Sequence, residues 1–342
     1  MALCVIVSRS RTYVAGVLQA RMPVLIFRKP CSATTRSHNR GRRLLIGCFA
    51  TFVVACGGDS SRRAANARAN ARDVAGQRDD FGRRIDFSRT AHRVVSLNPT
   101  TTETIFAIGA GDRLIGRSHW DEWPAQASAV ADLGDGIGPS VEAVLAARPD
   151  LVVLYASEDN RPAAERLESA GIRTISLRID RIADFNRAIA ILGRILDASA
   201  AAKTVGDSVS ASLTRVAAAT HTLPRPSVVW PLMDTSPMVV GGGSFINELL
   251  QIAGARNVYG DTPKPSPVVS MEDLVTRNPD LVIRGGEGGS TALLPAAWNA
   301  VPAVAAGRIV RIPLTLVLRP SVQMGTAATI IARALHPGLV LP

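Results

Sequence analysis

A fourteen-residue segment occurs twice in this chain of 342 residues, and the repeat constrains the fold more than any other feature. Residues 140–153 read SVEAVLAARPDLVV, and residues 270–283 read SMEDLVTRNPDLVI, at an offset of 130 positions without a gap. In each copy a serine can cap a short helix that has an acidic first turn, and Pro-Asp separates that helix from a buried parallel strand. The segments 103–110 and 248–255 also match. The sequence therefore predicts two α/β lobes of similar topology.

The segment between the two lobes predicts one long helix. Residues 199–222 are rich in alanine and contain no proline, and Pro224 and Pro226 follow them. A helix of about 20 residues is about 30 Å long, which is enough to bridge two lobes, and a helical connection allows only limited hinge motion. We therefore predict an α/β fold of two similar lobes, each with a mainly parallel sheet, joined by one long bridging α-helix.

A basic and then apolar segment near the start of the chain is typical of a secretion signal. Three arginines between positions 40 and 43 precede twelve apolar or small residues, which end at Cys56. This run is too short to span a bilayer but suits the hydrophobic region of a signal peptide. Its ending, VVACG, resembles a bacterial lipobox, so we predict that Cys56 is lipidated and anchors the protein to a membrane. A plain signal peptide with an unmodified cysteine is the alternative.

The predicted domain organisation has five parts, of which the first two precede the lobes. Residues 57–84 are polar, of low complexity and nearly free of large apolar side chains, so they cannot bury enough surface to order themselves. The five parts are a leader with a lipoprotein signal peptide at 1–55, the lipidated cysteine and a disordered tether at 56–92, the N-terminal lobe at 93–195, the bridging helix at 196–224 and the C-terminal lobe at 225–342.

The net charge of +11 belongs to the leader and tether. Residues 1–55 carry nine basic side chains and no acidic one, and residues 57–93 carry nine arginines against five aspartates, whereas the rest of the chain has a net charge of −2. A nucleic-acid-binding protein would need its cations on the folded lobes, so this class is disfavoured. All four cysteines lie at or before position 56, which excludes disulfides, cysteine-bound zinc, iron–sulfur clusters and thiol nucleophiles from the lobes.

The lipobox, tether, paired lobes and bridging helix together resemble the helix-linked (class III) substrate-binding proteins of ABC importers for cobalamin, haem and ferric siderophores. The opening RVVSLNPTTTE at 93–103 looks like the first strand and helix of that family, and GRSHWDEWP at 116–124 is closest to a loop of its cobalamin-binding members. The resemblance covers about residues 93–337. It implies an extracytoplasmic, monomeric receptor that is not an enzyme. Such a receptor captures a metal chelate, here cobalamin or another corrinoid, and delivers it to a permease dimer with ATPase subunits.

The resemblance also implies roles for particular residues. One glutamate in each lobe, Glu142 and Glu272, would dock into the two permease subunits, and the repeat places both at equivalent positions; alternatively, each would only stabilise a helix N-terminus. Three aromatic residues and one arginine would line the ligand cleft between the lobes, where loops follow the strands: Trp120, Trp123, Tyr155 and Arg319. No resident cofactor or protein-bound metal is implied.

Several alternatives remain open from the sequence. Cobalamin binders often carry tryptophans where this chain has Gly136 and Ser266, so a ferric siderophore or haem is the alternative ligand. His119 could be an axial ligand to a chelated metal, although a loop histidine is more often only hydrogen-bonded. An α/β enzyme, a zinc or manganese receptor and a surface-anchored protein without a ligand are the other classes. The first lacks a nucleophile or dinucleotide motif and the second lacks clustered histidines.

Overall fold

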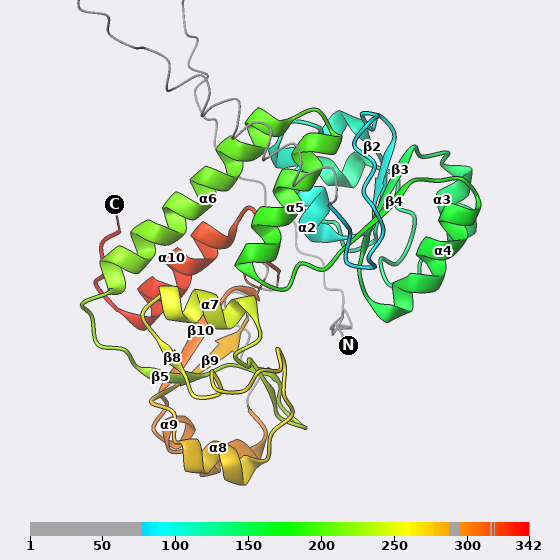
Figure 1. Ribbon diagram of the computed structural model, residues 1–342. Helices are drawn as coiled ribbons and strands as arrows, with labels where there is room; N and C mark the ends of the chain where they lie inside the picture. Colours follow the sequence, from blue (N-terminus) through cyan, green and yellow to red (C-terminus); the bar gives the residue numbers. More distant parts are fainter. Residues whose placement is uncertain (1–76, 287–293, 315–316, 318, 342) are drawn as a thin grey trace, which may run out of the picture. The chain divides into compact units, whose positions relative to one another are not determined.

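The computed structural model describes residues 77–286, 294–314, 317 and 319–341, which all belong to one compact unit spanning Ala75–Pro342 (Figure 1). The predicted leader, the lipidation site Cys56 and most of the predicted tether lie outside the described residues. Within the described ranges, no helix combines the length and the apolar character that crossing a membrane requires.

The N-terminal lobe contains a four-stranded parallel sheet in the order β2-β1-β3-β4. Three of its strands, β1, β3 and β4, are buried on both faces, as expected for a parallel sheet covered by helices. The strands are β1 (Val94–Ser96), β2 (Leu114–Arg117), β3 (Leu151–Tyr155) and β4 (Thr174–Leu177), and the helices are α2 (Pro99–Ala107), α3 (Val141–Ala146), α4 (Arg161–Ser169) and α5 (Ile182–Ile195).

The C-terminal lobe repeats this plan with a parallel sheet in the order β10-β9-β5-β8 and adds a two-stranded antiparallel ribbon, β6-β7. The strands are β5 (Ser227–Val229), β6 (Pro231–Met233), β7 (Met238–Val239), β8 (Arg256–Asn257), β9 (Leu281–Gly285) and β10 (Ile309–Ile312). The helices are α7 (Phe245–Ile252), α8 (Met271–Arg277), α9 (Pro302–Ala305) and α10 (Met324–Leu335).

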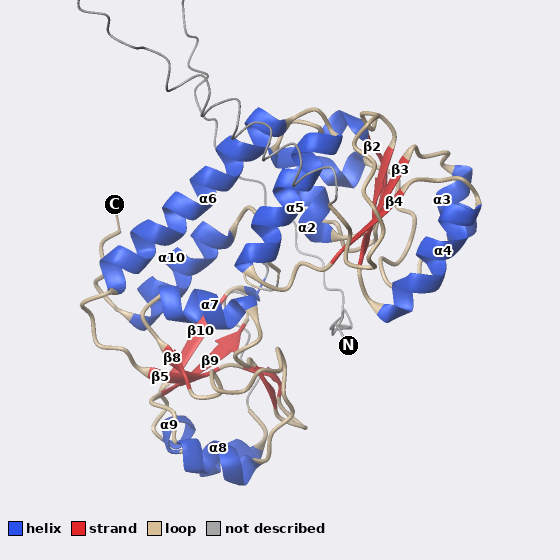
Figure 2. Cartoon of the chain, in the orientation of Figure 1, coloured by secondary structure: helices blue, strands red, loops and turns tan. Residues whose placement is uncertain are grey.

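The two sheets have the same topology when β1, β2, β3 and β4 are matched to β5, β8, β9 and β10. The single helix α6 (Ser199–Thr220) connects them, and α5 of one lobe and α10 of the other both pack against it (Figures 1 and 2). The buried faces of α5, α6, α7 and α10 share one hydrophobic core. The predicted fold class, two similar α/β lobes joined by a long helix, is confirmed.

The repeated segments form the same local structure in both lobes. The hydroxyls of Ser140 and Ser270 cap α3 and α8 by accepting hydrogen bonds from backbone N–H groups three residues later, at 3.2 Å and 3.1 Å. Both helices end near a residue in the left-handed region, Arg148 at φ 52° and Asn278 at φ 41°, immediately before the proline of the Pro-Asp pair. This conformation and the proline stop the helix and direct the chain into β3 or β9.

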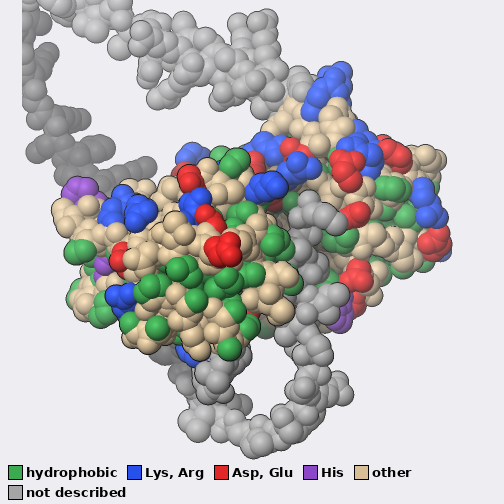
Figure 3. Space-filling view, turned by 90° about the horizontal axis from the view of Figure 1, so that it is seen from below, with side chains coloured by type: hydrophobic (Ala, Val, Ile, Leu, Met, Phe, Trp, Pro, Cys, Tyr) green, Lys and Arg blue, Asp and Glu red, His purple; other side chains and the backbone are tan. Residues whose placement is uncertain are grey.

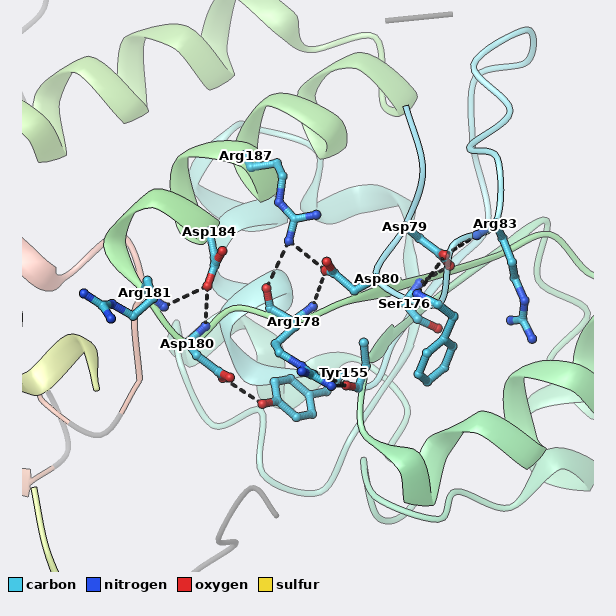
Figure 4. Close-up of polar contacts among 12 residues, drawn as sticks. Asp79, Asp80, Arg83, Tyr155, Ser176, Arg178, Asp180, Arg181, Asp184 and Arg187 are labelled. Atoms are coloured by element: carbon cyan, nitrogen blue, oxygen red, sulfur yellow. Dashed lines mark hydrogen bonds and ion pairs between the residues drawn. The ribbon is translucent and has the colours of Figure 1, made fainter. Parts of the chain in front are cut away.

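Residues 77–92 do not follow the prediction of a disordered tether, because they pack against the N-terminal lobe (Figure 4). The Asp80 N–H donates to the Ser176 carbonyl at 2.9 Å, and the Asp79 carboxylate accepts from the Ser176 N–H at 3.1 Å. Ser176 belongs to β4, the edge strand of the sheet, whose outer backbone groups would otherwise lack partners. Ile85 and Ala91 are buried. The folded region therefore begins well before position 93.

Candidate functional site

The loop after β2 carries the two predicted ligand-binding tryptophans on the surface of the N-terminal lobe. The side chains of Trp120 and Trp123 are 37% and 39% exposed, which is unusual for the largest apolar residue type. The indole Nε1 of Trp120 donates to Asp135 Oδ1 at 3.0 Å, and its ring meets the His119 ring edge-on with centroids 5.3 Å apart. One tryptophan thus has a fixed orientation while much of its surface faces outward.

Asp121, between the two tryptophans, is a fully buried carboxylate that anchors the loop. Its Oδ1 accepts from the Ser118 hydroxyl at 2.6 Å, and its Oδ2 accepts from the hydroxyl of Thr102 in α2. Burial raises the pKa of Asp121 to about 6, although these hydrogen bonds and the nearby charge of Arg319 act in the opposite direction. The loop is therefore fixed at its centre, and the flanking indoles lie on a rigid support.

Tyr155 ends β3, and its side chain is half-buried. Its hydroxyl donates to Asp180 Oδ1 at 2.7 Å (Figure 4). Burial, followed by the hydrogen bond and charge of Asp180, raises the Tyr155 pKa, so the hydroxyl stays protonated. Because the hydroxyl is occupied by this contact, Tyr155 can contact a ligand only through its aromatic ring.

Arg319 precedes α10 and forms an ion pair with a residue of the other lobe. Its Nε lies 2.6 Å from Oε1 of Glu103, which belongs to α2 and is fully buried. The Arg319 side chain remains 28% exposed, and none of the described residues accepts a hydrogen bond from its terminal nitrogens. The sequence predicted a cleft arginine here, but no sequence pattern indicated the buried carboxylate that orients this arginine.

The two predicted docking glutamates lie in the first turns of α3 and α8, as the repeat implied. The Glu142 side chain is 73% exposed and forms a 2.7 Å ion pair with Arg166 of α4. Its pKa is lowered by a hydrogen bond from its own backbone N–H and by Arg166. Glu272 is exposed and has no ion pair with any residue that the structure describes.

The structure brings together some of the predicted residues and leaves others apart. Thr102 and Glu103 are consecutive in α2, so the helix links the tryptophan loop, through Asp121, to Arg319. Tyr155 belongs to a separate network around Asp180 (Figure 4). Within the described ranges, no three His, Cys, Asp or Glu side chains are grouped so that they could hold a metal ion.

The C-terminal lobe exposes apolar side chains that the sequence analysis did not single out. Met233 and Val268 are 43% and 63% exposed. Met238 pairs with both of them, with Met233 across the β6-β7 ribbon and with Val268 through an isolated bridge, so the three form one strip. A methionine near the end of a short ribbon gave no periodic signal, and only the pairing shows that the strip is continuous.

The surface carries no concentration of positive charge on the face drawn in Figure 3. Among the described residues of that face, basic and acidic side chains lie interspersed. This distribution agrees with the charge count of the lobes, which disfavours a nucleic-acid-binding class.

The sequence profile of the family described as periplasmic binding protein matches residues 94–315, which cover most of both lobes. This chain belongs to the periplasmic binding protein family. A relative named vitamin B12-binding protein, from Vibrio parahaemolyticus serotype O3:K6, is 26% identical over 213 residues, or 62% of this chain and 78% of that protein. A protein of the same name from Yersinia pestis (strain Pestoides F) is 27% identical over 216 residues, or 62% of this chain and 75% of its own.

Solved structures show the same two-lobed fold. The periplasmic vitamin B12 binding protein BtuF of Vibrio cholerae superposes with a TM-score of 0.63 at 19% identity, covering 72% of this chain and 96% of that chain. The periplasmic heme-binding protein BhuT, in complex with two hemes, gives 0.64 at 22% identity, covering 73% and 100%. A protein of an ABC-type Fe³⁺-hydroxamate transport system from Saccharomonospora viridis gives 0.60 at 22% identity, covering 74% and 96%.

Family membership establishes the general class of activity. The family consists of substrate-binding proteins that work with ABC permeases and bind metal-chelate ligands, and it does not consist of enzymes. It also implies a periplasmic or otherwise extracytoplasmic location. The predicted class is therefore confirmed, whereas the roles of the individual residues stay predictions.

Proposed function

We propose that this protein captures cobalamin or another corrinoid and delivers it to an ABC permease driven by ATPase subunits. One observation carries the proposal: Trp120 and Trp123 stand half-exposed on a loop that a buried carboxylate fixes. Aromatic faces suit a corrin macrocycle because each ring can bury a large apolar area without losing much conformational freedom. The relatives named vitamin B12-binding proteins support the same ligand class.

Other side chains would complete the ligand site. Arg319 would direct its terminal nitrogens, which bind none of the described residues, to the amide or carboxylate edge of a chelate, while its Nε binds Glu103. Tyr155 would contribute its ring. The strip of Met233, Met238 and Val268, of which Met233 and Val268 are exposed, would offer apolar surface from the C-terminal lobe.

A ferric siderophore or haem is the second candidate ligand, and Gly136 is the observation that favours it. A Cβ atom at this position would collide with the carbonyl oxygen of Leu97, so the backbone here excludes every side chain. Cobalamin binders often carry a tryptophan at the matching position, and this chain could not accept one without moving its backbone. The ligand site must therefore differ locally from that of such proteins.

Calorimetric titration of the purified full chain tests the ligand class directly. We expect a 1:1 isotherm with cyanocobalamin and a Kd at or below about 1 μM, which corresponds to roughly −8 kcal/mol. Haemin and a panel of ferric siderophores are titrated in parallel. Binding of a ferric chelate or haemin without cobalamin would move the substrate to the second candidate, and no binding of any of them would overturn the proposal.

We further propose that lipidation at Cys56 anchors the protein, and that Glu142 and Glu272 dock onto the permease. The lipobox-like sequence supports the anchor, because a diacylated or triacylated N-terminus holds a protein on a membrane stably. Cells fed a labelled fatty acid should yield labelled protein from the wild-type gene and unlabelled protein from Cys56→Ser. Label in the variant would contradict the anchor at this residue.

A further inference from the structure

Two glutamates at equivalent positions of the lobes each reach across to the other lobe. Glu103 lies in α2, the first helix of the N-terminal lobe, and Glu248 lies in α7, its counterpart in the C-terminal lobe; the segments 103–110 and 248–255 match in sequence. Each carboxylate binds an arginine that precedes the last helix of the opposite lobe, α10 or α5. The contacts are therefore reciprocal.

The first contact is buried on its acidic side. Glu103 has no exposed surface, and its Oε1 lies 2.6 Å from Arg319 Nε. Its Oε2 lies 3.5 Å from Nε2 of Gln323, the residue that caps α10. A carboxylate in such a position is costly unless it is paired, so the lobes cannot separate here without exposing or stranding a charge.

The second contact has the same form but is more open to solvent. Arg181 directs Nε and Nη2 to Oε1 of Glu248 at 2.7 Å and 2.6 Å, with side chains that are 43% and 22% exposed. The other oxygen of Glu248 accepts from the N–H of Ile182, the first residue of α5, at 2.9 Å. A carboxylate at a helix N-terminus also interacts favourably with the helix dipole.

This second contact continues into the candidate ligand site. The Phe245 N–H of the C-terminal lobe donates to the Asp180 carbonyl at 3.1 Å, and the Asp180 carboxylate holds the Tyr155 hydroxyl. In Figure 4 the Arg181 side chain points away from the other labelled residues, which belong to the N-terminal lobe. Each contact therefore joins the lobes next to a predicted ligand-binding residue, Arg319 in one case and Tyr155 in the other.

We propose that the pairs Glu103–Arg319 and Glu248–Arg181 act as two reciprocal latches that hold the lobes at one separation before ligand binds. Helix α6 alone connects the lobes along the chain, and a single helix can bend. The latches lie near the N-terminal ends of α5 and α10, the two helices that pack against α6, and they restrict that bend. Glu103, Glu248 and Arg181 are then positioning residues. The effect of the latches on the lobe separation is independent of the proposed function. Only the further expectation that a fixed separation favours ligand binding rests on the proposed function.

Distances between spin labels on the two lobes test the proposal without any ligand. Ser169 in α4 and Thr276 in α8 are exposed, and the hydroxyl of each only binds a carbonyl of its own helix, so Ser169→Cys and Thr276→Cys are matched labelling sites. The full chain is used with its four cysteines changed to serine. We expect one narrow distance distribution for the otherwise unchanged chain.

Breaking the latches should broaden this distribution toward longer distances. Glu248→Ala should have a larger effect than Glu248→Gln, which keeps an acceptor for the Ile182 N–H. Glu103→Gln removes the first latch by eliminating the buried negative charge itself, so no carboxylate is left buried without a partner. Its combination with Glu248→Ala should have the largest effect. As the control, Arg187→Ala removes an ion pair of similar burial within the N-terminal lobe, where Arg187 lies 2.7 Å from Asp80 (Figure 4), and should leave the distribution unchanged.

A folded double variant with the wild-type distance distribution would overturn the proposal. If the double variant does not fold, Arg181→Ala and Arg181→Lys test the proposal instead, because Arg181 is the more exposed partner of the second latch. Broadening in Arg181→Ala that Arg181→Lys partly restores supports the latch, and a wild-type distribution in Arg181→Ala refutes it. Loss of ligand binding with an unchanged distribution would instead bear on the proposed ligand site.

Discussion

The loops that follow β2 and its counterpart β8 occupy equivalent places in the two lobes and have opposite character. After β2, Asp121 is fully buried and lies between two half-exposed tryptophans. After β8, Asp261 stands at the same spacing from its strand, but its side chain is 67% exposed and pairs with Arg277 at 2.9 Å. The aromatic residue of this second loop, Tyr259, is buried. Only the N-terminal loop therefore presents indole rings to solvent.

This difference shows which properties of a duplicated lobe are constrained. Strand order, helix caps and the Glu103 and Glu248 contacts are shared, because the packing of both lobes depends on them. Loops at the ends of the strands can diverge without cost to the core, and that is where ligand contacts usually arise. The lobes are equivalent as scaffolds and differ in the side chains that these loops present to solvent.

The largest expected effect concerns docking, where the lobes should behave alike. Glu142→Arg and Glu272→Arg should each abolish ligand uptake by cells, because the proposed docking pairs each glutamate with a basic partner on the permease, while ligand affinity stays unchanged. Uptake of radiolabelled ligand and calorimetry on the same variants measure the two quantities. Asp207→Arg, at a 66% exposed position of α6, reverses a charge away from both glutamates; it is the matched control and should transport normally. Normal uptake by either docking variant would contradict the docking role.

Substitutions in the equivalent loops of the two lobes should instead have different effects on ligand affinity. Trp120→Ala and Trp123→Ala should each weaken binding by about 10- to 100-fold, because truncating an aromatic anchor costs roughly 1.4 to 2.8 kcal/mol. Tyr259→Phe changes the equivalent loop of the other lobe at a buried position and should leave the affinity unchanged. Fluorescence or calorimetric titration gives the ratios. Wild-type affinity in both tryptophan variants would contradict the ligand-binding role of this loop, on which the proposed function rests.

The two loop carboxylates should have opposite effects on the pH dependence of stability. The pKa of Asp121 is about 6 in the folded protein, raised mainly by burial from its ordinary value of 3.8, so the folded state binds more protons than the unfolded state between these values. Stability from this group is present below pH 4 and is lost as the pH rises through 6, by up to about 3 kcal/mol. The pKa of Asp261 is lowered by its hydrogen bond to Arg277, so its contribution is lost as the pH falls.

Denaturant unfolding between pH 4 and pH 7 measures this difference. Asp121→Asn should remove this contribution, so its free energy of unfolding should decline less between pH 4 and pH 7 than that of the wild type, since the amide does not titrate. Asp261→Asn, the matched change in the other loop, should keep the decline. An unchanged pH profile in Asp121→Asn would mean that the buried carboxylate does not titrate in this window.

The sequence predicted the parts of the structure that depend on local signals. The elements α3 and β3, and likewise α8 and β9, are determined by a serine cap, a Pro-Asp pair and an apolar run that lie close together in the chain. The repeat was therefore sufficient to predict two lobes. The same holds for α6, whose alanine-rich sequence has no competing signal and ends before two prolines. In each case the determining residues are neighbours in the chain.

The candidate site depended on contacts between distant residues and was predicted only in part. Glu103 reads as an ordinary helical glutamate, and its partner Arg319 lies 216 positions away, so neither its burial nor its role in orienting the arginine was visible. Residues 77–92 gave a similar failure. Their composition is typical of disorder, yet Asp79 and Asp80 bind the free edge of β4, which no local pattern shows.

The smallest expected effect concerns a difference between the two predicted docking glutamates. Glu142 pairs with Arg166 beside a groove of about 400 Å³ between α3 and α4, so the proposed docking would exchange this arginine for a basic group of the permease. Arg166→Ala should therefore strengthen binding to the reconstituted permease by a few-fold at most, because exposed ion pairs contribute little. Arg161→Ala removes another exposed pair on α4, with Glu158, and should have no effect. Weaker docking in Arg166→Ala would instead show that the permease recognises Arg166 together with Glu142, and that the two lobes present chemically different docking surfaces.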